Sequence, residues 1–223
     1  MTIVPSKEVQ MNIAKLTRLA FSEFRPSVWR TFRALPYQGR CVVGQRFRLV
    51  GGNNIRATRN ARIKLGVGYY GFVDSRVGGL LRIGGRLEVN GTVSVASGNR
   101  WDIGQNSTMA VGDGTHFSPF VLIITSIGLT VGKNCAIGWN VQILDDDFHS
   151  LSVNGTLPGP TSKAIQIGNR VWIGSHAKIF KGVQIANGCV VAGNATVTRS
   201  FSEENCLIAG SPATVIRRNV AWH

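Results

Sequence analysis

The stretch that decides the fold is IGNRVWIGSHAKIFKGVQIANGCVVAGNATVTRSFS, residues 167–202. It consists of six-residue units in one frame, each opened by an aliphatic residue and each carrying a small or apolar residue at its fifth place. A helical stripe needs apolar positions at a spacing of about 3.6 residues, and the pattern is too regular for a hairpin ladder. It therefore predicts a β-solenoid with one short strand per unit. The aliphatic residues are Ile167, Ile173, Ile179, Ile185, Val191 and Val197.

The same frame returns upstream with interruptions, so we expect the solenoid to begin before residue 83. Earlier units are expected to open at Val43, Leu49 and Ile55, with a second register around Ile63 and irregular corners at 51–54. The upstream aliphatic and aromatic positions of the frame are Ile83, Val89, Val95, Val111, Phe117, Ile123, Val131, Ile137 and Ile143.

The 223 residues divide into two expected parts: a basic N-terminal segment, 1–40, and a solenoid domain, 41–223. Within the first part, 11–25 has helical periodicity and ends at Pro26. We expect this helix to cap the open end of the solenoid, or alternatively to dock on a membrane surface. The sequence shows no transmembrane stretch and no secretory signal, which favours a cytoplasmic protein that can work at the inner face of the membrane.

Charge is concentrated in the N-terminal part. Residues 1–100 carry 17 Lys and Arg against four acids, whereas residues 101–223 carry eight against seven. Nucleic acid is one class of partner for such a field, but the chain has no motif of a nucleic-acid reader and we expect no such partner. An anionic lipid surface or a substrate that carries phosphates fits better.

The four cysteines, at positions 41, 135, 189 and 206, form no CxxC pair. Cys135 and Cys189 occupy the small-residue place of their units, so they are expected to be buried thiols in a reducing compartment. Disulfide and zinc roles are not expected.

The frame breaks once in the C-terminal half, at LDDDFHSLSVNGTLPGPTSKA, residues 144–164. Its Gly, Pro, Ser and Asn content predicts a loop extruded from the wall, which we place at 145–166. His149 follows the acids Asp145 and Asp147, and a histidine beside a carboxylate is a common general base. The alternative interpretation is a solvated loop histidine.

Three segments resemble the hexapeptide-repeat acyltransferases, especially the galactoside and maltose O-acetyltransferase branch. They are IGNRVWIGSHAKIFKGVQI, VVAGNATVTRSF and AGSPATVIRR, within residues 167–218. The resemblance implies an all-β fold, a left-handed parallel β-helix of triangular section with three hexapeptides per coil. It also implies a homotrimer with acetyl-CoA in a groove between neighbouring subunits, and no metal.

The resemblance also implies roles for single residues. His149 falls on the catalytic base of the extruded loop, and Trp172 and Ser175 fall on the lining of the pantetheine groove. The backbone amide that meets the coenzyme in that family falls at Gly193, beside Ala192. The remaining residues expected near the coenzyme are Thr198, Arg199 and the arginine after the SPA turn, which falls on Arg217 or Arg218.

One departure from the branch concerns the acceptor. The asparagine that holds the galactoside is replaced within THFSPF, which puts Ser118 at that place with His116 nearby. The acceptor is therefore expected not to be a simple galactoside. His116 is balanced between acceptor binding and trimer packing.

Several candidate site residues could instead have a structural role or be exposed to solvent. Asp145 or Asp147 could orient His149, contact the acceptor or lie in a solvated turn. Trp172 could pack as a wall residue between subunits, and His176, on the next outward place, is expected to be solvated or interfacial.

The resulting hypothesis is an acetyl-CoA-dependent O-acetyltransferase acting on a carbohydrate. The acceptor would be a bacterial surface polysaccharide (capsule, lipopolysaccharide or exopolysaccharide) or its lipid-linked precursor. The alternatives are an N-acetyltransferase acting on an amino sugar or small molecule, a zinc β-helix of the carbonic anhydrase type, and a non-catalytic scaffold.

Overall fold

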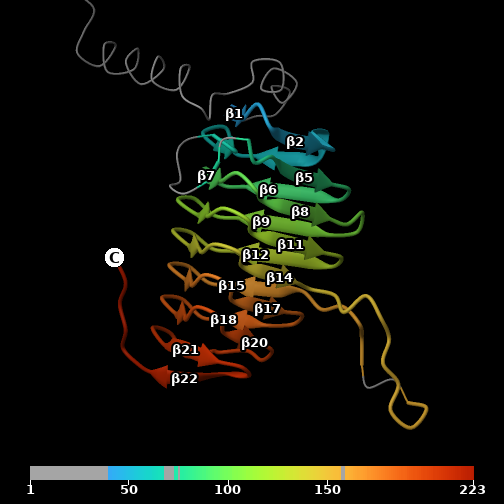
Figure 1. Ribbon diagram of the computed structural model, residues 1–223, viewed down its shortest axis with the longest axis vertical. Helices are drawn as coiled ribbons and strands as arrows, with labels where there is room; N and C mark the ends of the chain where they lie inside the picture. The colour runs from blue at the N-terminus through green and yellow to red at the C-terminus, as the bar shows by residue number, and fades with distance from the viewer. Residues whose placement is uncertain (1–39, 68–72, 75, 157–158) are drawn as a thin grey trace, which may run out of the picture.

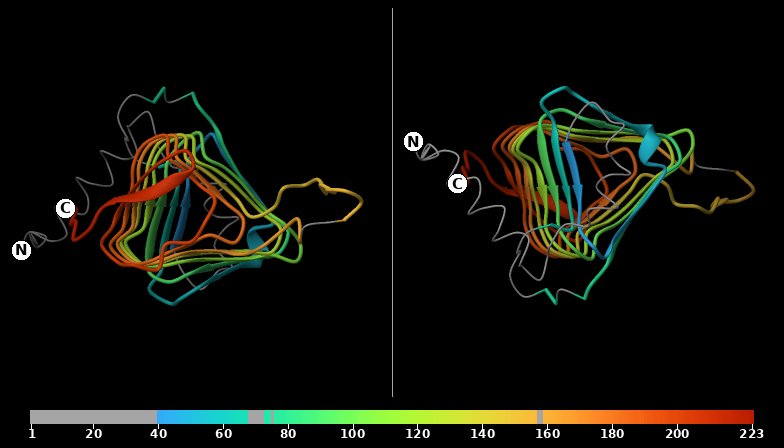
Figure 2. Two further views of the ribbon diagram at one scale, coloured as in Figure 1. Left: turned by 90° about the horizontal axis from the view of Figure 1, so that it is seen from below. Right: turned by 90° about the horizontal axis from the view of Figure 1, so that it is seen from above.

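The computed structural model describes residues 40–223, except 68–72, 75 and 157–158. These residues form a triangular prism of stacked coils (Figures 1 and 2), in which successive strands run around the prism from one face to the next. Segment 1–39, including the helix expected over 11–25, lies outside the described residues. The division at residue 40 stays a prediction.

Three sheets form the three faces of the prism, and all neighbouring strands are parallel except the last pair, β21 and β22. The first face contains β1 (Arg40–Val43), β4 (Arg62–Leu65), β7 (Thr92–Val95), β10 (His116–Phe117), β13 (Ala136–Ile137), β16 (Trp172–Ile173), β19 (Val190–Val191), β21 (Leu207–Gly210) and β22 (Ala213–Arg217). The second face contains β2 (Phe47–Val50), β5 (Gly79–Ile83), β8 (Arg100–Ile103), β11 (Leu122–Thr125), β14 (Gln142–Leu144), β17 (Lys178–Phe180) and β20 (Thr196–Val197). The third face contains β3 (Ile55–Ala57), β6 (Arg86–Val89), β9 (Thr108–Val111), β12 (Gly128–Val131), β15 (Ile165–Ile167) and β18 (Gln184–Ile185), and a short 3₁₀ turn, η1 (Gly52–Asn54), precedes β3.

The strand register explains the period of the sequence. Trp172 pairs with Val190, eighteen residues later, so a coil in the C-terminal part uses three hexapeptides. Upstream coils are longer: Phe117 pairs with Ile137, twenty residues later, and with Val95, twenty-two residues earlier. The extra residues lie in the corners, which is why the frame is interrupted there.

Burial confirms the inward positions. Every frame residue expected from Ile83 to Val197 is at most 3% exposed, and Val43, Ile55 and Ile63 are also buried. Leu49 is only partly buried against this core. The inward side chains of each strand stack on those of the paired strands in the coils above and below. The core is therefore a continuous column of apolar side chains.

All four cysteines are free and buried, as expected. Burial raises the pKa of the Cys41 thiol to about 12, which makes it an unreactive thiol at neutral pH.

The corners turn with left-handed backbone conformations that suit asparagine and glycine. Asn134 and Asn194 have φ of 54° and 61°. At one corner, asparagine side chains also form hydrogen bonds between successive coils. The backbone N–H of Asn169 donates to Asn187 Oδ1 at 2.7 Å, and that of Lys133 donates to Asn169 Oδ1 at 2.8 Å. These bonds lock successive coils in register.

The corner between the second and third faces carries the extruded loop, which we call the arm (residues 145–164; Figure 2). Its two stems pair with each other: Asp147 N donates to Thr161 O at 3.0 Å, and Lys163 N donates to Asp145 O at 2.9 Å. The predicted end at 166 was wrong, because Ile165 begins β15 and already pairs in the third face.

Asp145 fastens the root of the arm. It is 1% exposed, and its carboxylate accepts hydrogen bonds from Thr125 Oγ1 and from the backbone N–H groups of 126–128, at 2.7–2.9 Å. Thr125 in turn shares a 2.7 Å hydrogen bond with Ser107. A buried carboxylate is stable only with such partners, so the root is held by the preceding coil.

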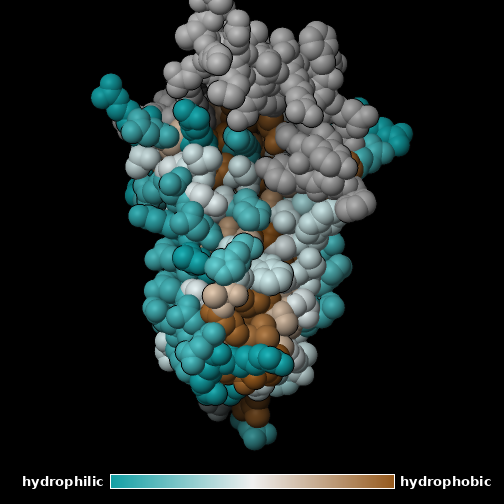
Figure 3. Space-filling view, turned by 90° about the vertical axis from the view of Figure 1, so that its left-hand side faces the viewer, coloured by the Kyte–Doolittle hydropathy of each residue, from teal (hydrophilic) through white to brown (hydrophobic). Residues whose placement is uncertain are grey.

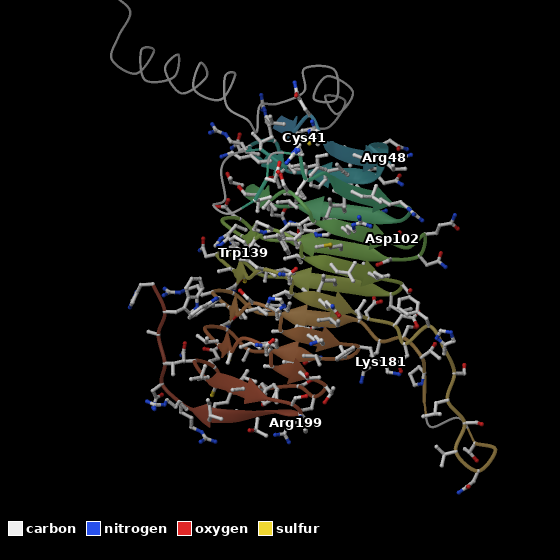
Figure 4. The ribbon with its side chains drawn as sticks, in the orientation of Figure 1. Cys41, Arg48, Asp102, Trp139, Lys181 and Arg199 are labelled. Atoms are coloured by element: carbon white, nitrogen blue, oxygen red, sulfur yellow. The ribbon has the colours of Figure 1, made fainter. Side chains whose placement is uncertain are left out.

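Lys181 holds the arm from the following coil. Its Nζ lies 2.6 Å from Asp147 Oδ2 and donates to Pro160 O at 2.8 Å, so one ammonium group contacts both stems. Figure 4 shows Lys181 on the edge of the prism from which the arm leaves. The arm beyond this clamp exposes apolar side chains: Phe148, Leu151 and Val153 are 53%, 71% and 55% exposed.

The column of inward residues predicts a strong dependence on side-chain volume. Ile173→Ala is expected to lower the free energy of unfolding by about 2–5 kcal/mol, because it removes buried methyl groups and leaves a cavity. The outward control Gln166→Ala should change it by less than about 0.5 kcal/mol. Urea unfolding followed by circular dichroism measures both, and equal effects would contradict the assignment of inward positions.

The anchoring of the arm predicts different effects for two neighbouring acids. Asp145→Ala is expected to cost about 3 kcal/mol or more, because it leaves four donors without their acceptor. Asp147→Ala removes only a half-exposed ion pair and should cost less than about 1 kcal/mol. The same unfolding measurement compares them, and a larger loss for Asp147→Ala would refute the anchoring role of Asp145.

Candidate functional site

His149 lies on the arm just beyond the Lys181 clamp, and it is exposed. Among the residues that the structure describes, no side chain forms a hydrogen bond or ion pair with its imidazole. The turn before it is set by Asp146, whose Oδ1 accepts the N–H of Phe148 at 2.7 Å while Phe148 takes a φ of 61°. The arm therefore presents an accessible imidazole from a fixed root.

Neither acid expected to orient His149 is bound to it. The carboxylate of Asp145 is directed into the wall, and that of Asp147 contacts Lys181. The structure gives Asp145 a different role, that of an anchor, which the sequence pattern did not indicate because its donors lie about one coil earlier. An orienting or acceptor-binding role for Asp147 stays a prediction.

Trp172 lies on the outer side of the first face and is 43% exposed. The strand register puts it in one outward row with His116 and Ala136 above it and with Val190 and Leu207 below it. Figure 3 shows apolar side chains gathered over the lower half of this side of the molecule. The row forms a surface on which a flexible, partly apolar ligand or a second subunit can pack.

His116 lies in this row two strands from Trp172, which corresponds to about 10 Å at ordinary strand spacing. Desolvation lowers the pKa of His116 below its ordinary value, so the imidazole is uncharged at neutral pH. A neutral imidazole is compatible with both expected roles, acceptor binding and packing.

The corner between the first and second faces carries four further predicted residues, and we call it the Ser175 corner (residues 118–121, 138–141, 174–177 and 192–195). Ser175 O accepts the N–H of Asn194 at 3.0 Å, and a side chain at Gly193 would contact this same carbonyl. Ser175 and Gly193 are exposed, and Ser118 lies two coils above in the same corner. The structure therefore brings Ser118, Ser175, Ala192 and Gly193 together along one edge.

His176 follows Ser175 in this corner with a φ of 63°, and its Nε2 lies 3.5 Å from Asn140 Nδ2. It is exposed in the single chain.

The predicted basic residues are divided between two places. Thr198 and Arg199 lie at the arm corner below Lys181, where the Arg199 guanidinium lies 5.5 Å from the ring centroid of Phe201. Arg217 ends β22 on the first face, and Arg218 forms a 3.0 Å ion pair with Glu203. The structure does not bring Thr198 and Arg199 to the Trp172 row.

Trp222 is a neighbour of Trp172 that the sequence pattern did not reveal. Its ring centroid lies 6.3 Å from that of Trp172, and its Nε1 donates to Arg170 O at 2.8 Å. The one sequence feature that could have indicated this contact is the single tryptophan in the polar segment 217–223. The tail closes one side of a pocket of about 440 Å³ lined by Asn169, Arg170, Asn187, Gly188, Glu204, Asn205, Ala221 and Trp222.

The arm and the Trp172 row lie on opposite sides of the prism. In a triangular section the corner between the second and third faces is opposite the first face, and Figure 2 shows the arm leaving from that corner. Figure 4 shows Trp139, of the Ser175 corner, on the side away from Lys181. One chain therefore does not bring His149 to Trp172.

Two further observations concern the described part of the chain. Within it, no three His, Cys, Asp or Glu side chains gather where they could hold a metal ion. None of the helices found there has the length and apolar content needed to cross a membrane.

Comparisons with known proteins agree with this architecture. Residues 164–199 match the family model described as bacterial transferase hexapeptide, six repeats. An uncharacterized 24.8 kDa protein in the cps region of Klebsiella pneumoniae is 34% identical over 188 residues, covering 84% of this chain and 83% of that protein. The polysialic acid O-acetyltransferase of Escherichia coli O1:K1 is 27% identical over 143 residues, covering 64% of this chain and 44% of that enzyme.

A solved structure has a similar fold. AntD, an N-acyltransferase from Bacillus cereus in complex with dTDP and 3-hydroxybutyryl-CoA, matches with a TM-score of 0.57 at 14% identity, over 89% of this chain and 90% of that one. The parallel three-faced prism and this likeness confirm the predicted fold class, a left-handed β-helix. The six-residue frame, the family model and the Klebsiella relative together show that the chain belongs to the bacterial hexapeptide-repeat transferase family.

Proposed function

We propose that this protein is an acetyl-CoA-dependent O-acetyltransferase that modifies a hydroxyl of a bacterial surface polysaccharide or of its lipid-linked precursor. The observation that carries the proposal is an accessible imidazole, His149, held on an anchored arm, in a fold that also exposes an apolar row around Trp172. A relative that acts on polysialic acid and another from a cps region support a polysaccharide acceptor.

The reaction needs one base and a site for a developing negative charge. His149 removes the proton of the acceptor hydroxyl, whose oxygen attacks the thioester carbonyl carbon. Ser175 or a backbone N–H at Gly193 donates a hydrogen bond to the oxyanion. The carbon–sulfur bond then breaks, and the imidazolium returns its proton to the departing thiolate. The products are the acetyl ester and coenzyme A.

We further propose that the site is completed in a homotrimer. The arm of one protomer would contact the Trp172 row of its neighbour, and three such contacts close a ring. The exposed Phe148, Leu151 and Val153 on the arm support this, because apolar side chains on a protruding loop gain stability when a second surface covers them. The coenzyme would lie between the two protomers, with Trp172 and Ser175 along the pantetheine.

The proposal includes the location of the reaction. A cytoplasmic enzyme has access to acetyl-CoA, and the basic N-terminal half suits work near anionic lipid at the inner face of the membrane.

The assignment of the base predicts the behaviour of two variants of the arm. His149→Ala should lower kcat by about 10²- to 10⁴-fold, because general-base catalysis contributes that much. Asn154→Ala, on the same arm, should keep wild-type turnover. Release of free thiol from acetyl-CoA in the presence of a bacterial polysaccharide panel measures both, and wild-type turnover in His149→Ala would refute the role of His149.

The shared site predicts complementation between two impaired variants, measured at a subsaturating concentration of acetyl-CoA. Trp172→Ala should raise the KM for acetyl-CoA about tenfold or more, because a large aromatic contact is lost. Unfolding and refolding a mixture of Trp172→Ala and His149→Ala should restore part of the activity, since some contacts then join an intact arm to an intact row. A mixture no more active than its two parents would exclude a site made from two protomers.

A further inference from the structure

A second recess lies on the arm corner, above the root of the arm. The connection between β5 and β6 is only Gly84–Gly85, whereas the corners before and after it are longer, 51–54 and 104–107. A Cβ on Gly85 would collide with the carbonyl oxygen of Ser107, so this corner has no room for side chains and lies deeper than its neighbours. The recess measures about 330 Å³ and is lined by Asn54, Arg56, Gly84, Gly85, Arg86, Gln105, Asn106, Ser107 and Thr108.

The donors of this recess are available for a ligand. Arg56 is held in place by bonds from its Nη1 to Asn53 O and Ile55 O, at 2.8 and 3.1 Å, and its other N–H groups have no partner in the part of the chain that the structure describes. Among the described residues, the Arg86 side chain contacts just one charged partner, Glu88, in a long ion pair of 3.6 Å between side chains that are 57% and 41% exposed. The side-chain amides of Gln105 and Asn106 are exposed, and none of the described residues bonds to them.

The charge around the recess selects an anion. Residues 40–100 contain eleven Lys and Arg, ten of them Arg, against two acids. A guanidinium binds a carboxylate through two parallel hydrogen bonds, and amides bind hydroxyl groups. Two arginines and two amides around one recess therefore match a sugar that carries a carboxylate.

The recess and the arm lie on the same edge of the prism. The corners 84–85, 104–107, 126–127 and 145–164 follow one another in successive coils, because β5, β8, β11 and β14 are neighbours in the second face. At the ordinary strand spacing, the recess lies about 10–15 Å from the root of the arm. A polysaccharide of several sugar units can bridge this distance along the edge.

We propose that this recess, through Arg56 and Arg86, binds a carboxylate-bearing sugar of the acceptor polysaccharide and directs a neighbouring sugar toward His149. The proposal rests on the proposed function and specifies its substrate class, an acidic polysaccharide. In this arrangement the two substrates bind to different protomers. The protomer that provides His149 binds the acceptor, and the neighbouring protomer binds the coenzyme.

The test measures polymer binding without acetyl-CoA. Isothermal titration calorimetry at low salt compares polygalacturonate oligosaccharides with neutral maltooligosaccharides of the same length. The site variant is R56Q/R86Q, and the matched control is R48Q/R62Q, which removes the same charge from exposed arginines on the other two faces. R86Q alone serves if the double variant does not fold, because the weak ion pair with Glu88 is the one contact that the Arg86 side chain would lose within residues 40–67, 73–74, 76–156 and 159–223.

The expected result is binding of polygalacturonate by the wild type, a loss of affinity of about tenfold or more in R56Q/R86Q, and less than about twofold in R48Q/R62Q. Equal losses in both double variants would mean non-specific attraction to a basic surface and would overturn the proposal. So would equal binding of the neutral oligosaccharide, no binding of polygalacturonate, or an effect of R56Q/R86Q on binding to phosphatidylglycerol vesicles alone.

Repeating the titration with His149→Ala separates this proposal from the proposed function. The variant should bind polygalacturonate as the wild type does, because the recess contains no part of the arm. A failure of the catalytic role appears as retained turnover in His149→Ala. A failure of the recess appears as unchanged binding in R56Q/R86Q.

Discussion

The structure depends on the burial of inward side chains, one or two from each strand, which stack on the inward side chains of the strands in the neighbouring coils. Ile137, Ile173, Val191 and Ile208 follow one another in the first face with at most 1% exposure, and the other two faces contain equivalent columns. Since close-packed interiors resist deformation, each face and each corner keeps its place relative to the others. The prism is therefore a frame in which corners far apart in sequence form straight edges.

Rigid edges have a consequence for chemistry. The arm leaves one edge, and the Trp172 row occupies the face opposite that edge. No bending of a packed prism can close this separation within one chain, whereas a second copy can place its row against the arm. Bringing the two reactants together in such a seam reduces the entropic barrier of the reaction, provided that the arm itself is held still. Residues 125–128 of the coil above supply that restraint through their hydrogen bonds to Asp145, and Lys181 of the coil below supplies it through its ion pair with Asp147.

Sequence periodicity predicted what is local and repeated, and it missed what depends on contacts between coils. The inward residues from Ile83 to Val197 could be assigned because each hexapeptide encodes its own strand. The role of Asp145 could not, since its donors at 125–128 are brought near only by the stacking of coils. Trp222 was missed for a similar reason: the tail returns to Arg170, 52 residues earlier. The sequence pattern did not predict the recess, because the recess forms where Gly84 and Gly85 have no side chains to fill the corner.

The position of Arg56 at the recess suggests a more specific role for the basic half of the chain than its net charge does. A net positive charge alone attracts any anion, whether lipid, nucleic acid or polysaccharide, and decides nothing about orientation. Arg56 differs from the other described arginines because two backbone carbonyls fix its guanidinium at the rim of a recess. A fixed guanidinium loses less entropy on binding than a free one, and its position on the arm's own edge gives a bound polymer a direction. The same stacking that separates His149 from Trp172 thus aligns His149 with a site for an acidic chain.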